Sequence, residues 1–228
     1  VPDLDVNDAR IAIDAAYDAF PNWSKKTAKE RSIILNKFCK LMLENADDLA
    51  AILTAEMGKP LAEAKGEITY GASFIEWFAE EGKRIYGETI PGHQEDKRII
   101  VLKQPVGVVA AITPWNFPMN QIVLKVIPAL AAGCTMILKP SEIAPVSAVL
   151  FAEMIDEAGF PAGVFNLVNG NGEVVGNHIS GHPDIDMVSF TGSTRAGKLI
   201  QKNAADTIKK VTLELGGKGG NIVFADSY

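Results

Sequence analysis

Five short apolar runs, separated by amphipathic stretches, fill the second half of the chain from residue 107 onward. The runs are VGVVAAI, TMILK, VFNLV, DMVSF and VTLEL, and the helical patterns between them fall at roughly 119–132, 145–158, 173–180 and 194–206. Short, continuously apolar strands that alternate with amphipathic helices indicate a parallel sheet with helices on both faces. The chain is therefore predicted to have an α/β fold.

Each of these strands is followed by a loop rich in polar and turn-forming residues. The loops are TPWNFP, KPSE, NGNG, FTGST and ELGG. Because ligands of parallel sheets bind at the carboxyl ends of the strands, we expect the functional site to be built from these loops.

The first third of the chain is helical by pattern. One helix follows a cap at Asp5, a second runs from residue 27 until Gly58 and Pro60 end it, and a third begins at Leu61. Cys39 shares an apolar face of the second helix with residues four positions away, which predicts a buried structural thiol.

Charge and composition exclude several classes of partner. The net charge of −6, without a lysine or arginine block, argues against binding to nucleic acid or to an anionic membrane. No apolar stretch is long enough for a membrane span, and acidic residues stand where a signal-peptide core would be, so we expect a cytoplasmic protein.

A metal site is not expected either. The chain has two cysteines and three histidines, which is too few for the usual structural zinc patterns. His178 and His182 are four residues apart, but Gly181 and Pro183 are predicted to break any helix that would align them.

Two glycine motifs resemble phosphate-binding loops without matching them. GSTRAGKL matches a phosphate loop through Lys198, but Leu199 stands where a serine or threonine must bind magnesium, so an NTPase is not predicted. We expect a helix start at which Gly192 and Ser193 let a ligand approach backbone N–H groups; a purely structural turn is the alternative. GNGEVVG, residues 170–176, has one residue too many for a dinucleotide fingerprint, and a tight strand-to-helix turn explains it equally well.

Two strand-end residues are candidates for catalytic roles. Two prolines stiffen TPWNFP, so that Asn116 can donate to an oxyanion or, equally, cap the following helix. Glu214 ends an apolar run just before Gly216 and Gly217, which suits a general base; capping of nearby N–H groups is the alternative.

Together, TPWNFP, ILKPSE, FTGST and LELGGK, in this order and at these strand ends, resemble the aldehyde dehydrogenase superfamily. Residues 57–92 look similar to its bacterial succinate-semialdehyde dehydrogenase branch. Such enzymes oxidise an aldehyde to an acid with NAD or NADP, through a cysteine thiohemiacetal and a thioester. The resemblance implies a Rossmann-like sheet, a β-hairpin oligomerisation arm, a small aldehyde substrate and a homo-oligomeric full-length form. It divides the chain into a helical part (1–82), the arm hairpin and its return (83–106), and the NAD-binding core (107–228).

The resemblance also implies roles for individual residues. Asn116 would stabilise the oxyanion, Glu214 would be the base, and Lys125 would take part in proton relay, with a solvated helix lysine as the alternative for Lys125. In the cofactor site Lys139 and Glu142 would hold the adenine ribose, Gly192 and Ser193 would approach the pyrophosphate or nicotinamide, and Trp115 and Leu215 would lie near the nicotinamide. The full set of expected cofactor-binding residues is Thr113, Pro114, Trp115, Lys139, Ser141, Glu142, Gly192, Ser193 and Leu215.

Two positions predict specificity. A carboxylate at Glu142 can accept hydrogen bonds from a ribose 2′-hydroxyl and repels a 2′-phosphate, which favours NAD over NADP. Leu124 stands where the succinate-semialdehyde branch typically carries an arginine for the substrate's distal carboxylate. This difference predicts a preference for short uncharged or hydroxylated aldehydes.

The nucleophilic cysteine of the family is expected downstream of Glu214, so the catalytic cysteine domain is absent from this chain. Cys39 belongs to the first-third helices, and Cys134 is predicted at the amino end of a strand, away from the ligand edge. The 228-residue chain is therefore predicted to be inactive by itself. A non-catalytic nucleotide-binding module and an interaction protein are the alternatives.

Overall fold

A five-stranded parallel sheet in the order β5-β4-β3-β6-β7 forms the centre of the molecule. The structure is a computed structural model that describes residues 1–227. The strands are β3 (Val108–Ile112), β4 (Thr135–Lys139), β5 (Phe165–Leu167), β6 (Met187–Gly192) and β7 (Lys210–Leu215). The chain moves outward from β3 through β4 to β5, and then crosses to the other side of β3 to form β6 and β7. The strand order thus reverses between β3 and β6.

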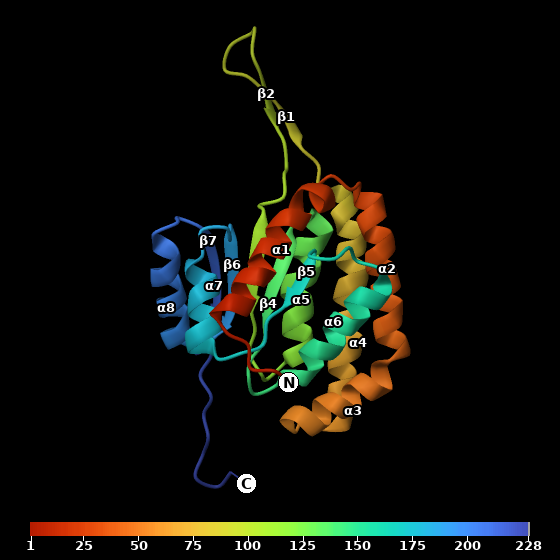
Figure 1. The fold of residues 1–228 in the computed structure, drawn as a ribbon, viewed down its shortest axis with the longest axis vertical. Helices are drawn as coiled ribbons and strands as arrows, with labels where there is room; N and C mark the ends of the chain where they lie inside the picture. Colours follow the sequence, from red (N-terminus) through yellow and green to blue (C-terminus); the bar gives the residue numbers. More distant parts are fainter. Residues whose placement is uncertain (228) are drawn as a thin grey trace.

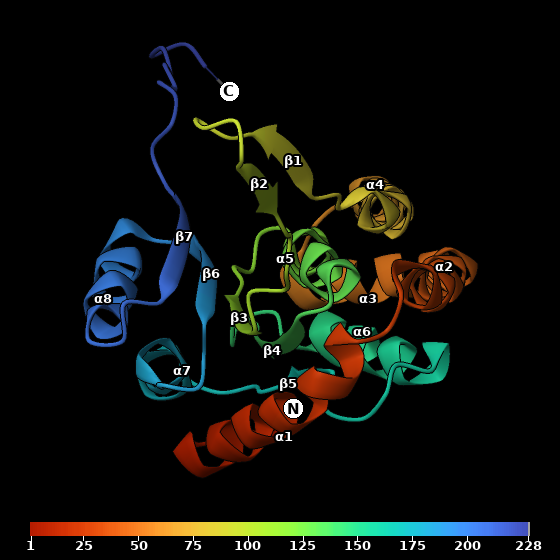
Figure 2. The ribbon, with the colours of Figure 1, turned by 90° about the horizontal axis from the view of Figure 1, so that it is seen from above.

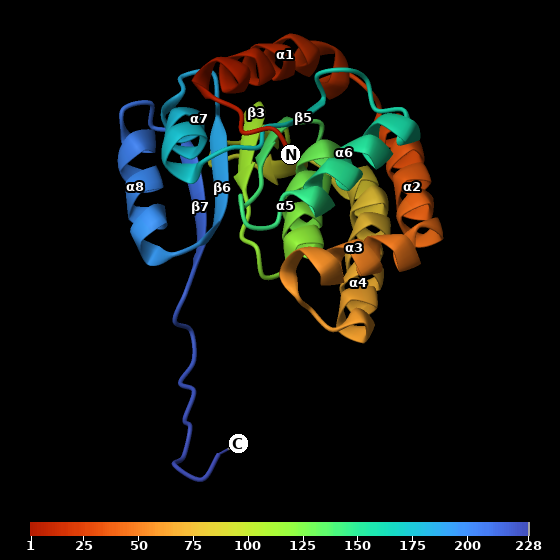
Figure 3. The same ribbon diagram turned by 60° about the horizontal axis from the view of Figure 1, so that its bottom comes forward.

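Successive residues of β3 face two different cores, as the period of two in a strand requires. Val108, Ala110 and Ile112 belong to one apolar cluster, and Val109 and Ala111 belong to the other. Helices α1, α7 and α8 lie on the first side of the sheet, and α5 and α6 lie on the second (Figure 3). The helices of the second half are α5 (Pro118–Ala132), α6 (Val146–Ala158), α7 (Asn177–Gly181) and α8 (Thr194–Ala205), with a π-helical turn η2 (Gly172–Gly176) before α7. The α/β class and the parallel sheet are confirmed.

The covering of the sheet is incomplete at β7. Val211, Leu213 and Leu215 pack against the core on the α8 side, whereas Thr212 and Glu214 on the opposite face are exposed. The prediction of helices on both faces thus holds for the middle of the sheet, and one face of its last strand is open.

The first third of the chain forms four helices and a short 3₁₀ turn. They are α1 (Val6–Ser24), α2 (Ala28–Glu44), α3 (Ala46–Met57), α4 (Leu61–Glu81) and η1 (Gly82–Arg84). Capping boxes begin the first two helices, with Asp5 bonded to Asp8 and Thr27 bonded to Glu30.

The predicted single helix from residue 27 to 57 is wrong at Asn45. The Asn45 side chain donates to the carbonyl oxygen of Leu41 at 2.8 Å, and its backbone leaves the helical region. An asparagine side chain offers the backbone a local alternative partner, which ends one helix and begins the next at this residue.

A two-stranded antiparallel hairpin projects from the body of the molecule (Figures 1 and 2). Strands β1 (Glu88–Pro91) and β2 (Arg98–Val101) pair with Glu88 opposite Val101, within the predicted arm. Ile90, Ile99 and Ile100 on these strands are exposed. The hairpin is confirmed, and its role in oligomerisation stays a prediction.

Cysteine and histidine placements differ in part from expectation. Cys39 is half-buried and its Sγ donates to the carbonyl oxygen of Ala72 at 3.4 Å, so the predicted full burial of this thiol is wrong. The helical face that carries it turns outward by Leu43, which is exposed. His178 and His182 lie together after all, with ring centroids 5.2 Å apart, because α7 extends to Gly181 and His182 directly follows it.

Burial, followed by the neighbouring charges of His182 and Arg10, lowers the pKa of His178. Within residues 1–227, no group of three histidine, cysteine or acidic side chains is arranged to hold a metal ion. Across the same residues, no helix has both the length and the apolar content that crossing a membrane requires.

Candidate functional site

A cavity of about 710 Å³ opens at the carboxyl edge of the sheet, where the strand order reverses between β3 and β6. This is the position at which open parallel sheets bind ligands, because the crossovers leave in opposite directions there. The predicted cofactor-binding residues that line it are Thr113, Pro114, Trp115, Lys139, Ser141, Glu142, Gly192 and Ser193. The cavity therefore brings together every residue of that predicted set except Leu215.

Lys139 and Glu142 form an ion pair at the floor of this cavity. The Lys139 side chain is only 2% exposed, and its Nζ donates to Oε2 of Glu142 at 2.9 Å. Partial burial by itself raises the pKa of Glu142, but the hydrogen bond and charge of Lys139, with backbone N–H groups including that of Gly172, lower it overall. The buried ammonium thus holds an ionised carboxylate at the cavity wall.

Helix α8 begins at the cavity as predicted for the GST segment. Ser193 is its N-cap, and the Ser193 Oγ accepts a hydrogen bond of 3.2 Å from the backbone N–H of Ala196. The remaining first-turn N–H groups and the positive end of the helix dipole suit an anionic ligand. Because the Ser193 hydroxyl caps the helix, the backbone N–H groups at the start of α8 are better donors to a ligand.

Two threonines of the cavity lining have buried hydroxyls without a partner among residues 1–227. The hydroxyls are the Oγ1 atoms of Thr113, directly after β3, and Thr191, in β6. Thr191 follows Phe190, which packs on the α8 side of the sheet, so the Thr191 hydroxyl faces the opposite side, the one that also carries Ser189.

Several residues that line the cavity were missed by sequence reasoning. They are Asn171, Gly172, Glu173, Gly176, Asn177, Arg195, Lys198 and Lys202. The GNGEVVG stretch had been set aside because its glycine spacing fails the dinucleotide pattern, yet η2 and the start of α7 form one wall. The signal that could have found it is topological, since the segment after β5 must cross the carboxyl edge to reach β6.

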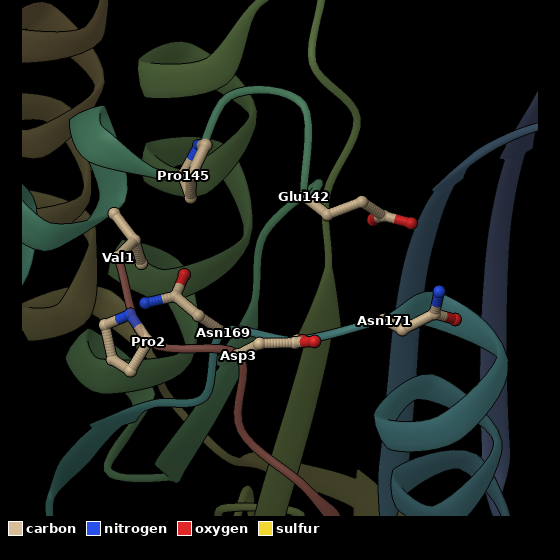
Figure 4. Close-up of a pocket in the computed structure, with 8 residues that line it drawn as sticks. Val1, Pro2, Asp3, Glu142, Pro145, Asn169 and Asn171 are labelled. Atoms are coloured by element: carbon tan, nitrogen blue, oxygen red, sulfur yellow. The ribbon is translucent and has the colours of Figure 1, made fainter.

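A smaller hollow of about 260 Å³ adjoins the large cavity and shares Glu142 and Asn171 with it. Figure 4 shows the side chains of these two residues on one side of the hollow, with Val1 and Pro2 on the opposite side. The Oδ1 atom of Asn169 is buried here without a partner among the described residues.

Asn116 lies exposed on the loop between β3 and α5 and does not line the cavity. Its alternative role as a helix cap is wrong, because α5 begins at Pro118 and the N-cap position belongs to Phe117. The first-turn N–H groups of Met119 and Asn120 donate instead to Glu67 on α4. The side-chain amide of Asn116 is thus left for another partner, and its oxyanion role stays a prediction.

Lys125 projects from α5 toward the sheet. Its Nζ donates to the Oγ of Ser189 on β6 at 3.4 Å, and burial lowers the pKa of Lys125. The alternative reading as a solvated helix lysine is therefore wrong. A partly buried lysine with a lowered pKa gives up its proton more readily than an ordinary lysine, and the relay role stays a prediction.

Glu214 stands in β7 directly beside Thr191 of β6. Its side chain is 62% exposed and pairs with the Lys218 ammonium rather than with backbone N–H groups, so the capping alternative is not what the structure shows. Residues in register on parallel strands face the same side, which places Glu214 on the face that also carries Ser189, the partner of Lys125. Leu215 faces the other side and packs against Gly197 of α8.

Neither cysteine is placed for nucleophilic chemistry at this edge. Cys134 is buried immediately before β4, at the amino end of the sheet, as predicted. Burial raises the pKa of both Cys134 and Cys39, which keeps these thiols protonated and unreactive.

Residues 1–227 match the sequence model of the aldehyde dehydrogenase family. The chain is 59% identical over 227 residues to the succinate-semialdehyde dehydrogenase [NADP(+)] GabD of Escherichia coli, covering 100% of this chain and 47% of that protein. It is 57% identical, with the same coverage, to the glutarate-semialdehyde dehydrogenase of Pseudomonas putida.

Among solved structures, betaine aldehyde dehydrogenase from Staphylococcus aureus in complex with NAD+ superposes with a TM-score of 0.94 at 40% identity. That similarity covers 99% of this chain and 45% of the other. The chain thus spans about half the length of the relatives that it matches.

Proposed function

Because the chain belongs to the aldehyde dehydrogenase family, we propose that it forms the cofactor-binding half of an enzyme that oxidises an aldehyde to a carboxylic acid with NAD or NADP. The observation that carries this proposal is the cavity at the carboxyl edge between β3 and β6, which is lined by residues that the family resemblance assigns to the cofactor. Its lining combines a helix N-terminus with an ionised carboxylate that is paired with a buried lysine. These groups match the ribose and pyrophosphate of a dinucleotide in chemistry.

In this proposal each part of the cavity holds one part of the cofactor. Lys139 and Glu142 bind the adenine ribose, and the backbone at Gly192 and Ser193 receives the pyrophosphate at the start of α8. Trp115, which is 47% exposed, forms a face near the nicotinamide. When bound, the nicotinamide ring supplies the acceptor for the hydride that leaves the aldehyde carbon.

The groups proposed for acyl chemistry are separate from the cavity lining. Asn116 donates its amide to the developing oxyanion, and Glu214 serves as the base that activates the thiol or the hydrolytic water. Lys125 assists proton movement from the same face of β6 and β7. The nucleophilic cysteine is proposed to come from sequence that this chain does not include, since the chain covers 47% of the E. coli relative.

The substrate is proposed to be a small aldehyde. The two relatives named above act, by their names, on semialdehydes of dicarboxylic acids. Leu124, half-buried on α5, points to an uncharged substrate instead, because it gives a distal carboxylate no bidentate partner.

Cofactor titration of the 228-residue chain, followed by the fluorescence of Trp115, tests the first step. We expect saturable binding of NAD+, and Trp115→Phe should remove most of the signal change. An absence of NAD+ and NADP+ binding would contradict the proposal and favour an interaction protein.

Turnover tests the second step. The chain alone is expected to form no reduced nicotinamide with any aldehyde, whereas a longer polypeptide that carries the remaining half of the family sequence is expected to do so. Cofactor binding without turnover by the longer polypeptide would favour a non-catalytic nucleotide-binding module.

A further inference from the structure

A buried ion pair, formed by Lys59 before α4 and Glu67 within α4, lies behind the loop that carries Trp115 and Asn116. We propose that this pair positions the loop for the reaction. The inference rests on the proposed function, because Lys59 and Glu67 are assigned to hold the loop that carries Asn116, the proposed oxyanion donor. The same loop contributes Thr113, Pro114 and Trp115 to the proposed cofactor site.

Glu67 holds the end of the loop at which α5 begins. Its side chain is 1% exposed, and its Oε1 accepts hydrogen bonds of 3.0 Å from the backbone N–H groups of both Met119 and Asn120. The N-cap residue Phe117 provides no side-chain cap of its own. A carboxylate from a neighbouring helix therefore satisfies the first turn of α5 and complements the positive end of its dipole.

Lys59 holds the middle of the same loop. Its side chain is 8% exposed, and its Nζ contacts Oε2 of Glu67 and donates to the backbone carbonyl oxygen of Asn116 at 3.0 Å. The same ammonium lies 3.6 Å from the centroid of the Phe117 ring. One cation thus fixes the main chain of Asn116 and the side chain of the next residue.

The two contacts act on the part of the loop where accuracy matters. An oxyanion donor works only if it is held within about 0.5 Å of its productive position, and the amide of Asn116 is carried by the backbone that Lys59 grips. Neither Lys59 nor Glu67 lines the cavity, so both are positioning residues.

Stability is a poor explanation for such a pair. Apolar replacement of both partners of a buried ion pair is often neutral or stabilising, because desolvation of two charges offsets their attraction. What an apolar pair cannot provide is the directed bond from Lys59 to the Asn116 carbonyl. The charges of Lys59 and Glu67 are therefore explained by the position in which they hold the loop, rather than by a gain in stability.

The test compares the double variant Lys59→Met/Glu67→Gln with the wild-type chain. The glutamine keeps an acceptor for the α5 N–H groups, and the methionine fills the volume of the lysine without its charge. We expect a melting temperature close to wild type, while hydrogen exchange in residues 113–120 rises about tenfold or more and exchange elsewhere is unchanged. The single variant Glu67→Gln, which keeps Lys59, gives a second measurement if the double variant does not fold.

In the longer polypeptide, the double variant should lower kcat by about 10²-fold and change the KM for cofactor by much less, because a displacement near 1 Å costs that much in rate. A matched control is Lys65→Met/Asp47→Asn, which removes an exposed lysine–carboxylate pair of 2.7 Å and should change none of these quantities.

Wild-type exchange at residues 113–120 together with wild-type kcat in the double variant overturns the inference. The exchange measurement needs no cofactor and no turnover. If the wild-type protein binds no NAD(P), the proposed function fails while the exchange data still decide whether the pair anchors the loop.

Discussion

Glu214 of β7 lies in parallel register with Thr191 of β6, so the candidate base is adjacent to a residue that lines the proposed cofactor cavity. Thr191 is one residue before Gly192, at which β6 ends. The two strands therefore bring the proposed acid–base chemistry and the proposed cofactor site to the same edge. Leu215, the next residue of β7, faces the α8 side of the sheet. Glu214 therefore faces the opposite side, which separates the candidate base from the helix start proposed for the pyrophosphate.

The coenzyme preference depends on Glu142. The wild-type chain should bind NAD+ more tightly than NADP+, because an ionised carboxylate accepts from the 2′-hydroxyl and repels a 2′-phosphate. Glu142→Gln should narrow the difference by about ten- to hundredfold, as expected for loss of one charge-assisted hydrogen bond. Titrations with both cofactors measure it, with Glu173→Gln as a control for a carboxylate elsewhere on the cavity wall. Equal or tighter binding of NADP+ by the wild-type chain would contradict the predicted preference for NAD. The E. coli relative carries NADP(+) in its name.

The lowered pKa of Lys125 predicts a pH-dependent stability. The fold disfavours the protonated lysine, so its burial costs stability at neutral pH, and this cost disappears as pH rises from the lowered pKa toward the ordinary value. Lys125→Met should therefore increase the free energy of unfolding at pH 7 by about 1 kcal/mol, with a smaller gain in alkaline solution. Urea denaturation at several pH values measures it. Lys29→Met, at an exposed position of α2, should show no such trend; an equal gain in both variants would refute the explanation.

Asn116→Ala should lower kcat by about 10²- to 10³-fold in the longer polypeptide, if the amide donates to the oxyanion. Cofactor affinity should stay nearly constant, because Asn116 does not line the cavity. Steady-state kinetics and NAD+ titration measure the two effects. Asn22→Ala, on an exposed position of α1, is the matched control. A decrease of less than threefold for Asn116→Ala would remove this residue from the mechanism.

Leu124 predicts that butyraldehyde and lactaldehyde have higher kcat/KM than succinate semialdehyde in the longer polypeptide. A leucine gives an uncharged chain apolar contact and leaves a distal carboxylate without a bidentate partner. Leu124→Arg should shift the ratio toward succinate semialdehyde by about tenfold or more, whereas Leu124→Gln should shift it less. A clear lead for the carboxylated substrate in the wild-type protein would end the idea.

Gly107 precedes β3 with a φ of +126°, a conformation that side-chain-bearing residues rarely adopt. An added Cβ would lie 1.9 Å from Oδ2 of Asp186, the atom that accepts a 2.8 Å hydrogen bond from the N–H of Val108. Gly107→Ala should therefore reduce the free energy of unfolding by about 2–4 kcal/mol. The control is Gly66→Ala in α4, where a Cβ meets open space and should stabilise the helix by about 0.5–1 kcal/mol. Equal effects of the two alanines in urea denaturation would contradict this account.

The order of strands and helices in the second half of the chain could be predicted from the sequence because each element has a recognisable local pattern of apolar residues. The position of the cavity at the carboxyl edge could be predicted for a related reason. Residues that directly follow parallel strands must meet at one edge of the sheet, so Thr113, Lys139 and Gly192 come together without any knowledge of side-chain packing.

Tertiary structure decided the features that depend on contacts between distant segments. Glu67 is 52 residues before Met119 in the sequence, and no local pattern indicates that it caps α5 in place of Asn116. The partial burial of Lys125 depends on Ser189, 64 residues away on another strand. The contact of His178 with His182 depended on how far α7 continued, which local breaker residues did not settle.

The physical reason is the range of the interactions involved. Hydrophobic periodicity and turn chemistry act within a few residues, so the sequence by itself determined the α/β class, the parallel sheet and the edge that forms the cavity. Burial, ion pairing and the capping of helix ends by side chains from other elements depend on residues that are distant in sequence. These contacts form only when the segments pack together. The tertiary structure therefore decided that Glu67 and Lys59 hold the Asn116 loop and that Lys125 is desolvated.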